Sequence, residues 1–281
     1  MPHLSQLQRD NKDSKFTIIA VTAEDKSNTL EAVKGMVEDK GDGMDYTVAW
    51  DNDRNTYTSF MTAAEQRGIP ASFLIDKSGK IAWIGHPANA DVPIAGVIDG
   101  TWDNVKGPAM MKAIREARAA IYRSAATDPK AALELLTAFR KDNPTAAKGL
   151  EGIHFTILSK LPDHKAETEK LGASIIAQAI DKGDSNALNG FAWNLVDPEV
   201  KTENRFLGLA LKAAEHANKL TENKSPAVLD TLARVYFWQG ELDKAVKTQT
   251  IATDNAEGKM KESLSKALDE YKKALKDKEA A

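Results

Sequence analysis

The sequence predicts an α/β region at the N-terminus followed by an all-α region built from helical hairpins. Two observations predict this division. Up to about residue 90, short apolar runs rich in β-branched residues alternate with segments of helical periodicity. From Met110 onward the strand pattern disappears, and alanine- and leucine-rich segments follow one another, separated by helix breakers. We therefore expect an α/β domain over residues 1–90, a linker over 91–108 and a helical domain over 109–281.

The first region predicts four strands and two helices. Phe16–Val21 is a short continuous apolar run, which is typical of a strand covered on both faces. The Asp76–Gly79 turn predicts a hairpin, so the last strand should pair antiparallel with its predecessor. Strands separated by helices otherwise favour a parallel sheet. The remaining elements are expected as a helix over 29–41, a strand over 46–50, a helix over 56–67, and strands over 71–75 and 80–85.

The helical region shows a weak internal repeat. Helices joined by short loops must pack antiparallel to their neighbours. In two segments, 111–144 and 226–257, an alanine of the first helix precedes an alanine of the second by twelve residues. Small residues at that offset let the helices approach closely, and a tyrosine would fill the space beside them. The residues that we expect to pack in this way are Ala119, Tyr122 and Ala131 in one hairpin, and Leu232, Ala233, Tyr236, Ala245 and Ala252 in the other.

Residues 226–257 resemble a tetratricopeptide repeat, and 111–144 is a second match. The hairpins between them depart from the 34-residue period of that family, so the array would be irregular. A plain helical bundle with chance recurrence of alanine is the alternative. Lys259–Lys278 continues as one amphipathic helix, whose charged outer face would suit a terminal cap.

The N-terminal region is similar to the thioredoxin-like redoxins of the TlpA-like thiol:disulfide interchange type. The most specific element is Ile69-Pro70-Ala71 with the strand after it, which resembles the loop that holds a cis-proline opposite the active-site cysteines. The 76–81 hairpin, the 48–57 segment and Pro2-His3-Leu4 carry the rest of the resemblance. The resemblance implies a thioredoxin-like fold over 1–90 and a cis peptide bond before Pro70.

The departure from that family is severe, because the sequence contains no cysteine. In the family, a buried strand and a Trp-Cys-x-x-Cys turn precede the segment that resembles Pro2. Thiol exchange requires a thiolate, so this chain should have no such activity. The strands over 16–21 and 71–76 would flank the missing one. We expect them either to pair directly or to borrow a strand from a partner chain, for instance in a homodimer. A start codon placed too late is the third alternative.

Composition and motifs exclude several other functions. A net charge of −3 gives no reason to expect nucleic-acid binding, and no apolar stretch is long enough to span a membrane. The Asp51–Asn55 stretch lacks the glycine and glutamate of a calcium loop and more plausibly caps the following helix. The five histidines are scattered singly, and no nucleotide-binding motif occurs, so we expect no metal and no cofactor.

The sequence thus favours a non-catalytic scaffold that binds a protein or peptide partner through its helical domain. The alternative is the C-terminal portion of a thiol:disulfide oxidoreductase whose signal peptide and CxxC lie upstream of Met1. The N-terminus carries no export signal, which predicts a cytoplasmic location for the chain as given. An upstream signal peptide would instead make it periplasmic or extracytoplasmic.

Overall fold

The computed structural model describes residues 2–26, 28–200 and 205–280. The chain divides into two compact units. The N-terminal unit comprises Met1–Ala119 and Phe139–Lys148, and the helical unit comprises Ala120–Ala138 and Gly149–Ala281. Two helices, α4 (Gly107–Thr127) and α5 (Pro129–Asp142), contribute residues to both units.

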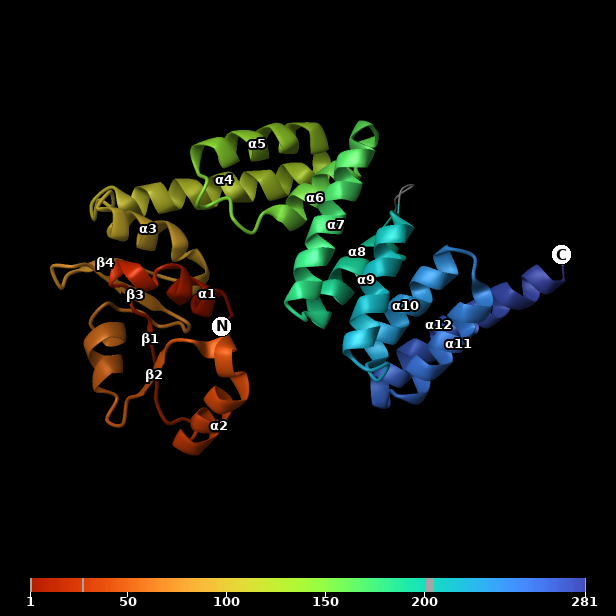
Figure 1. The fold of residues 1–281 in the computed structure, drawn as a ribbon, viewed down its shortest axis with the longest axis horizontal. Coiled ribbons are helices and arrows are strands. Elements are labelled where there is room, and N and C mark those ends of the chain that lie inside the picture. The colour runs from red at the N-terminus through yellow and green to blue at the C-terminus, as the bar shows by residue number, and fades with distance from the viewer. Residues whose placement is uncertain (1, 27, 201–204, 281) are drawn as a thin grey trace. The chain divides into compact units, whose positions relative to one another are not determined.

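The N-terminal unit contains the α/β elements that the sequence predicts (Figure 1). The second helix predicted, over 56–67, is realised as a shorter π-helical segment. In chain order the main elements are α1 (Pro2–Asp10), β1 (Ile19–Thr22), α2 (Leu30–Lys40), β2 (Thr47–Trp50), the π-helical segment Tyr57–Thr62, β3 (Ser72–Ile75), β4 (Ile81–Gly85) and α3 (Asp91–Asp99).

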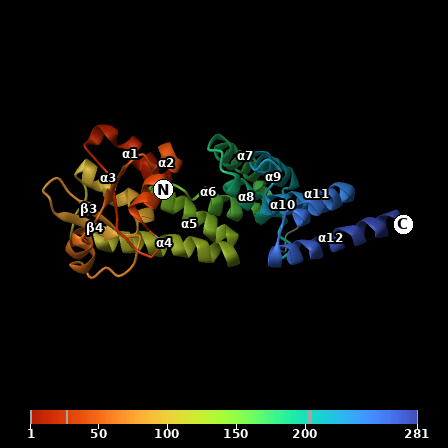
Figure 2. The same cartoon turned by 90° about the horizontal axis from the view of Figure 1, so that it is seen from below.

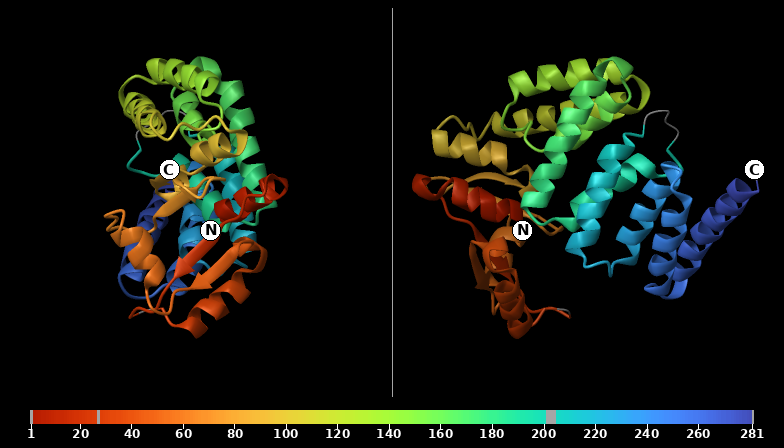
Figure 3. Two further views of the ribbon diagram at one scale, coloured as in Figure 1. Left: turned by 90° about the vertical axis from the view of Figure 1, so that its left-hand side faces the viewer. Right: turned by 45° about the vertical axis from the view of Figure 1, so that its right-hand side comes forward.

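The strands form two separate two-stranded sheets. β1 pairs in parallel with β2, with Ile19 opposite Thr47, and β3 pairs antiparallel with β4, with Ser72 opposite Gly85. Within the described residues no ladder joins the two sheets, which appear as separate pairs of arrows in Figure 3. The alternative in which the strands over 16–21 and 71–76 pair directly is therefore wrong. Each of these strands has a partner on one edge, and in the part of the chain that the structure describes no third strand lies against its other edge.

The prediction that the first strand is covered on both faces is also wrong. β1 begins three residues later than the apolar run, and two of its four side chains are exposed, Ile19 at 57% and Val21 at 46%. These residues alternate along the strand, so they lie on one face. The apolar run has the composition of a central strand, whereas β1 is an edge strand with one open face.

The segment over 91–108, which is expected as a linker, contributes to the core of the N-terminal unit. Ala90 and Ile94, at the start of α3, are buried with Trp83 of β4. The indole of Trp102 packs against the same cluster, and its Nε1 donates a hydrogen bond to the carbonyl oxygen of Ala82 over 2.9 Å. Residues 91–108 thus contain the helix α3, which packs on this unit.

In the described residues of the helical unit, seven helices follow α5, and Figures 1 and 2 show them side by side. Each packs mainly on the next helix, while α7 also meets α9 and α8 meets α10. They are α6 (Glu151–Ser159), α7 (Lys165–Asp181), α8 (Ser185–Val196), α9 (Leu207–Leu220), α10 (Pro226–Trp238), α11 (Leu242–Asp254) and α12 (Gly258–Glu279).

Breakers in the sequence set the ends of these helices. The Asp184 side chain caps α8 by accepting the backbone N–H of Ala187 over 2.9 Å. Pro226 occupies the first turn of α10, where its missing N–H costs nothing, and Gly240 adopts a positive φ of 76° in the turn after α10. Small residues let the helices approach: a Cβ on Gly172 of α7 would lie 2.5 Å from the side chain of Leu209. None of the helices in the described part of the chain combines the length and apolar character needed to cross a bilayer.

Candidate functional site

The loop before β3 adopts the conformation that the resemblance implies. The Ile69–Pro70 peptide bond is cis. Ile69 is 83% exposed, Pro70 is exposed and Ala71 is half-buried at the start of β3. Because the sequence contains no cysteine, this loop has no thiol of its own chain to face. The described residues therefore supply no nucleophile for disulfide exchange at this loop.

The Asp51 side chain caps the helical segment after β2. Its two carboxylate oxygens accept the backbone N–H groups of Thr56 and Tyr57 over 3.2 and 3.0 Å. Desolvation alone would raise the pKa of Asp51, but these hydrogen bonds outweigh it and lower the pKa below its usual value. The arrangement is that of a helix cap, and within the described residues no cluster of three acidic or histidine side chains could hold a metal ion.

Most of the predicted packing residues of the last hairpin are buried, but Leu232 packs towards α8 and α9 rather than towards α11. Leu232 and Ala233 of α10 are buried, as are Ala245 and Ala252 of α11. Tyr236 is half-buried, and its ring lies 5.3 Å from the Lys244 ammonium.

In the hairpin of α4 and α5, burial falls on different residues from those predicted. Ala119 and Ala131 are only half-buried, and Tyr122 is 51% exposed. The residues that are buried instead are Ile121, Ala125, Ala132 and Leu136. Both helices carry apolar residues at consecutive positions, so a spacing of three or four residues fits two adjacent helix faces. The buried face is the one next to the face that was predicted.

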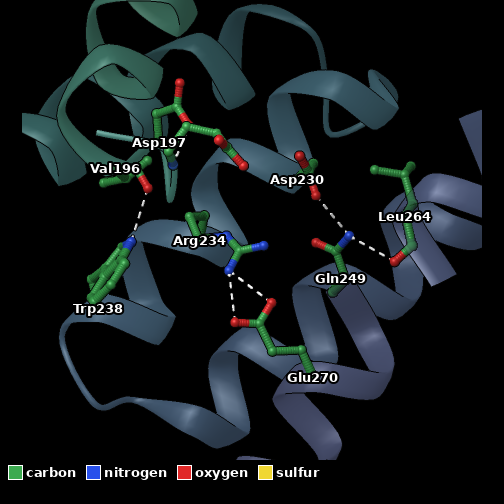
Figure 4. A network of polar contacts seen from close by, with 9 residues as sticks. Val196, Asp197, Asp230, Arg234, Trp238, Gln249, Leu264 and Glu270 are labelled. Carbon is green, nitrogen blue, oxygen red and sulfur yellow. Dashed lines mark hydrogen bonds and ion pairs between the residues drawn. The ribbon is translucent and has the colours of Figure 1, made fainter. Parts of the chain in front are cut away.

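A polar cluster, which the sequence does not predict, joins α10, α11 and α12 (Figure 4). Arg234 of α10 is buried and its Nη1 donates to both carboxylate oxygens of Glu270 in α12, over 3.1 and 2.9 Å. Gln249 of α11 is fully buried, and its Nε2 donates to Asp230 over 2.7 Å and to the carbonyl oxygen of Leu264 over 3.1 Å. The only signal in the sequence is that these polar residues stand on helix faces that are otherwise apolar.

Aromatic rings complete this cluster. Tyr271 of α12 is fully buried and stacks on Phe237 with ring centres 4.7 Å apart. The Arg234 guanidinium lies 4.8 Å from the centre of the Tyr271 ring. Burial raises the pKa of Tyr271 well above its usual value, and it also raises the pKa of Asp230 against the lowering effects of Gln249 and Arg234. The cluster thus holds one buried cation between an acid on its own helix and an acid on α12.

A second polar arrangement fixes the end of α8. The indole Nε1 of Trp238 donates to the carbonyl oxygen of Val196 over 2.8 Å, as Figure 4 shows. Arg205 donates to the carbonyl oxygens of Leu195 and Asp197, and its guanidinium stacks 4.0 Å from the Trp238 ring. These side chains satisfy carbonyl groups that a helix end leaves without partners. The role of Arg205 is therefore structural, although it also borders a surface hollow at the start of α9.

The chain thus consists of a small α/β region without cysteine, followed by an all-α region of packed helices. A comparison with protein families identifies the first region. Residues 1–84 match the model of the AhpC/TSA family, which includes the peroxiredoxins and redoxins. This match covers the cis-proline loop and ends within β4, so the helices lie outside it. The comparisons with curated proteins and with solved structures gave no match.

Proposed function

We propose that this chain is a non-catalytic interaction protein in which a cysteine-free redoxin domain carries a helical, tetratricopeptide-like module that binds a protein or peptide. The observation that carries the proposal is the complete absence of cysteine from a redoxin-family region attached to stacked helices. Helical arrays of this kind present extended surfaces to partners. Leu220 of α9 and Ile251 of α11 are apolar side chains that this unit exposes to solvent.

Two measurements test the proposal. The purified chain should give no turnover in an insulin-reduction assay, and any turnover above the uncatalysed rate would contradict it. Affinity capture with quantitative mass spectrometry should then enrich a partner that rebinds when purified. The Leu220→Ser, Ile251→Ser variant should bind this partner more weakly, whereas the Ile75→Ser variant, altered at an exposed residue of the N-terminal unit, should bind it like the wild type. Equal binding by both variants would contradict the assignment to the helical unit.

A second candidate function is favoured by the open sheet edges. In this candidate, residues 1–281 are part of a thiol:disulfide oxidoreductase of the TlpA-like type, and the missing strand and CxxC belong to a longer polypeptide. Among the described residues, β1 and β3 each pair along one edge only, as they would in a sheet that lacks its central strand. The coding sequence upstream of codon 1 decides the matter: an in-frame strand and CxxC support this candidate, and a stop codon before any such segment eliminates it.

The same open edge supports a proposal about assembly. We propose that β1 can pair with a second copy of the chain, because an unpaired edge strand with exposed apolar residues recruits another strand. Analytical ultracentrifugation should show concentration-dependent dimers of the wild type. The Ile19→Lys, Val21→Lys variant should be monomeric, while Leu30→Lys, which alters an exposed residue of α2, should leave the dimer intact. A monomeric wild type up to high concentration would refute the proposal.

A further inference from the structure

The last helix, α12, closes the helical unit without a hairpin partner of its own. It packs on α11 and reaches α10 through the Arg234–Glu270 ion pair. Figure 2 shows it lying alongside α11 at the end of the helical series. Two large side chains of α12, Leu264 and Tyr271, are buried in this contact. The residues that they meet on the neighbouring helices and the following turn are Leu229, Ala233, Ala245, Ala252 and Ala256.

The contact also buries polar atoms without hydrogen-bond partners. Among the described residues six buried side-chain atoms lack a partner, and three of them belong to this contact: Arg234 Nε, Gln249 Oε1 and the Tyr271 hydroxyl. Each of the three side chains touches α12 or belongs to it, since Arg234 bonds Glu270 and Gln249 bonds the carbonyl oxygen of Leu264. In Figure 4 the amide oxygen of Gln249 is on the side of the cluster that faces Arg234.

Unpartnered buried polar atoms lower the free energy of opening this contact. A polar atom that loses water without gaining a partner destabilises the closed state, and the atom recovers its hydration when the contact opens. On its other side, α10 packs through Val228, Leu232 and Val235 on α8 and α9. α10 is thus held by helices on two sides, whereas α12 packs mainly on α11.

We propose that α12 opens as a unit and that the face of α10 and α11 beneath it receives an amphipathic helix from the partner protein. This inference rests on the proposed function as a protein-binding module and specifies the partner. The helix already seated on the face defines the chemistry that fits. Leu264, Leu268 and Tyr271 lie on one face of α12 at spacings of four and three, and Glu270 supplies the acid that pairs with the buried Arg234.

The partner helix should therefore carry two leucines and an aromatic residue at this spacing, with an acidic residue beside the aromatic one. Phenylalanine should bind more tightly than tyrosine at the aromatic position, because it brings no hydroxyl group into a place without a hydrogen-bond partner.

Hydrogen exchange of the full-length chain tests the opening. Backbone amides of α12 should exchange together and about tenfold or more faster than those of α10, because sub-global opening needs less free energy than unfolding of the whole unit. The Tyr271→Phe variant should slow exchange in α12. Tyr122→Phe is the matched control, since Tyr122 is half-exposed on α4 and should change nothing. Equal exchange rates in α12 and α10, or faster exchange in Tyr271→Phe, would overturn the inference.

A synthetic peptide with the sequence of residues 258–279 tests the receiving face. Its binding to the full-length chain, measured by fluorescence anisotropy, should strengthen in a Leu264→Ala chain, because apparent affinity rises with the population of the open state. The Lys261→Ala chain, altered at an exposed position of the same helix, should behave like the wild type. A peptide with Glu270→Lys should bind at least about tenfold more weakly, since it sets a cation against Arg234.

The outcomes separate this inference from the proposed function. A partner that binds the helical unit without changing exchange in α12 leaves the proposed function standing and refutes the inference. If the peptide binds but no protein partner is found, the receiving face is supported and the proposed function is contradicted. Dimers that exchange α12 between copies would contradict the choice of a separate partner, and failure of the peptide to bind even the Leu264→Ala chain would overturn the receiving face.

Discussion

Replacing Tyr271 with phenylalanine is expected to stabilise the chain, although loss of a tyrosine hydroxyl ordinarily removes a hydrogen bond. The Tyr271 hydroxyl is buried and has no hydrogen-bond partner among the described residues. Burying such a group costs about 1–3 kcal/mol, so its removal should raise the free energy of unfolding by about 1 kcal/mol after partial relaxation. Tyr271→Ala should instead destabilise by about 3–5 kcal/mol, because it deletes a ring that stacks on Phe237.

Urea denaturation followed by far-ultraviolet circular dichroism measures both effects, with Tyr122→Phe as the exposed control. A Tyr271→Phe variant that is destabilised by about 1 kcal/mol or more would refute the reasoning, since the hydroxyl would then have a partner. The order of the three variants is the decisive result.

The pH dependence gives a second, independent check. Burial raises the pKa of Tyr271 in the folded chain, whereas the unfolded chain has the usual value of about 10. Above that pH the unfolded state loses the phenolic proton while the folded state keeps it, so the unfolded state binds fewer protons. This contribution to stability is complete below the unfolded pKa and declines as pH rises towards the folded pKa. The wild type should therefore lose stability in alkali more steeply than Tyr271→Phe.

Three further predictions concern other positions. Gly172→Ala should destabilise the helical unit by about 1–3 kcal/mol, because the added Cβ overpacks the contact with Leu209. Gly152→Ala is the control and should be neutral or stabilising, because a Cβ there meets nothing within 4 Å. Equal effects of the two substitutions in thermal melts would contradict the close approach at Gly172. The Ser78 hydroxyl and backbone N–H groups lower the pKa of Asp76, so the β3–β4 hairpin should lose stability as pH falls through that lowered value, and Asp76→Asn should abolish this dependence in acid titrations followed by NMR. Glu270→Gln should cost about 1 kcal/mol, because the carboxylate is half-exposed and its partner Arg234 is buried; a loss no larger than that of Asp269→Asn in urea titrations would argue against the pair.

The fold class could be predicted from the sequence because its two signals are local. Period-two and continuous apolar runs mark the four strands, and breakers such as Pro226 and Gly240 mark helix ends, so an α/β region followed by packed helices is confirmed. Pairing between strands is not local. The sequence of β1 is that of a central strand, and only the structure shows that Ile19 and Val21 are open to solvent.

The candidate sites, too, could be predicted only where their signal in the sequence is local. Pro70 could be singled out because its neighbours form a recognisable motif. The cluster around Arg234 could not, because its members come from three helices, and a polar residue on an otherwise apolar helix face does not reveal its partner on another helix. Gln249 is the exception in hindsight: it occupies a position of α11 between the buried Ala245 and Ala252, where a packed residue is expected. The faces of α4 and α5 could not be fixed because alanine is compatible with either side of a helix.

Packing between successive helices in the helical unit affects how that unit folds. Within the series of helices from α7 to α12, contacts join residues that are near in sequence, because each helix meets the next one or the next but one. Low sequence separation between contacts shortens the loops that must close in the folding transition state and favours rapid folding. The helical unit can thus begin to fold from several places along its length. The β1–β2 pair, by contrast, must close a crossover that contains the whole of α2 before its first ladder bond forms.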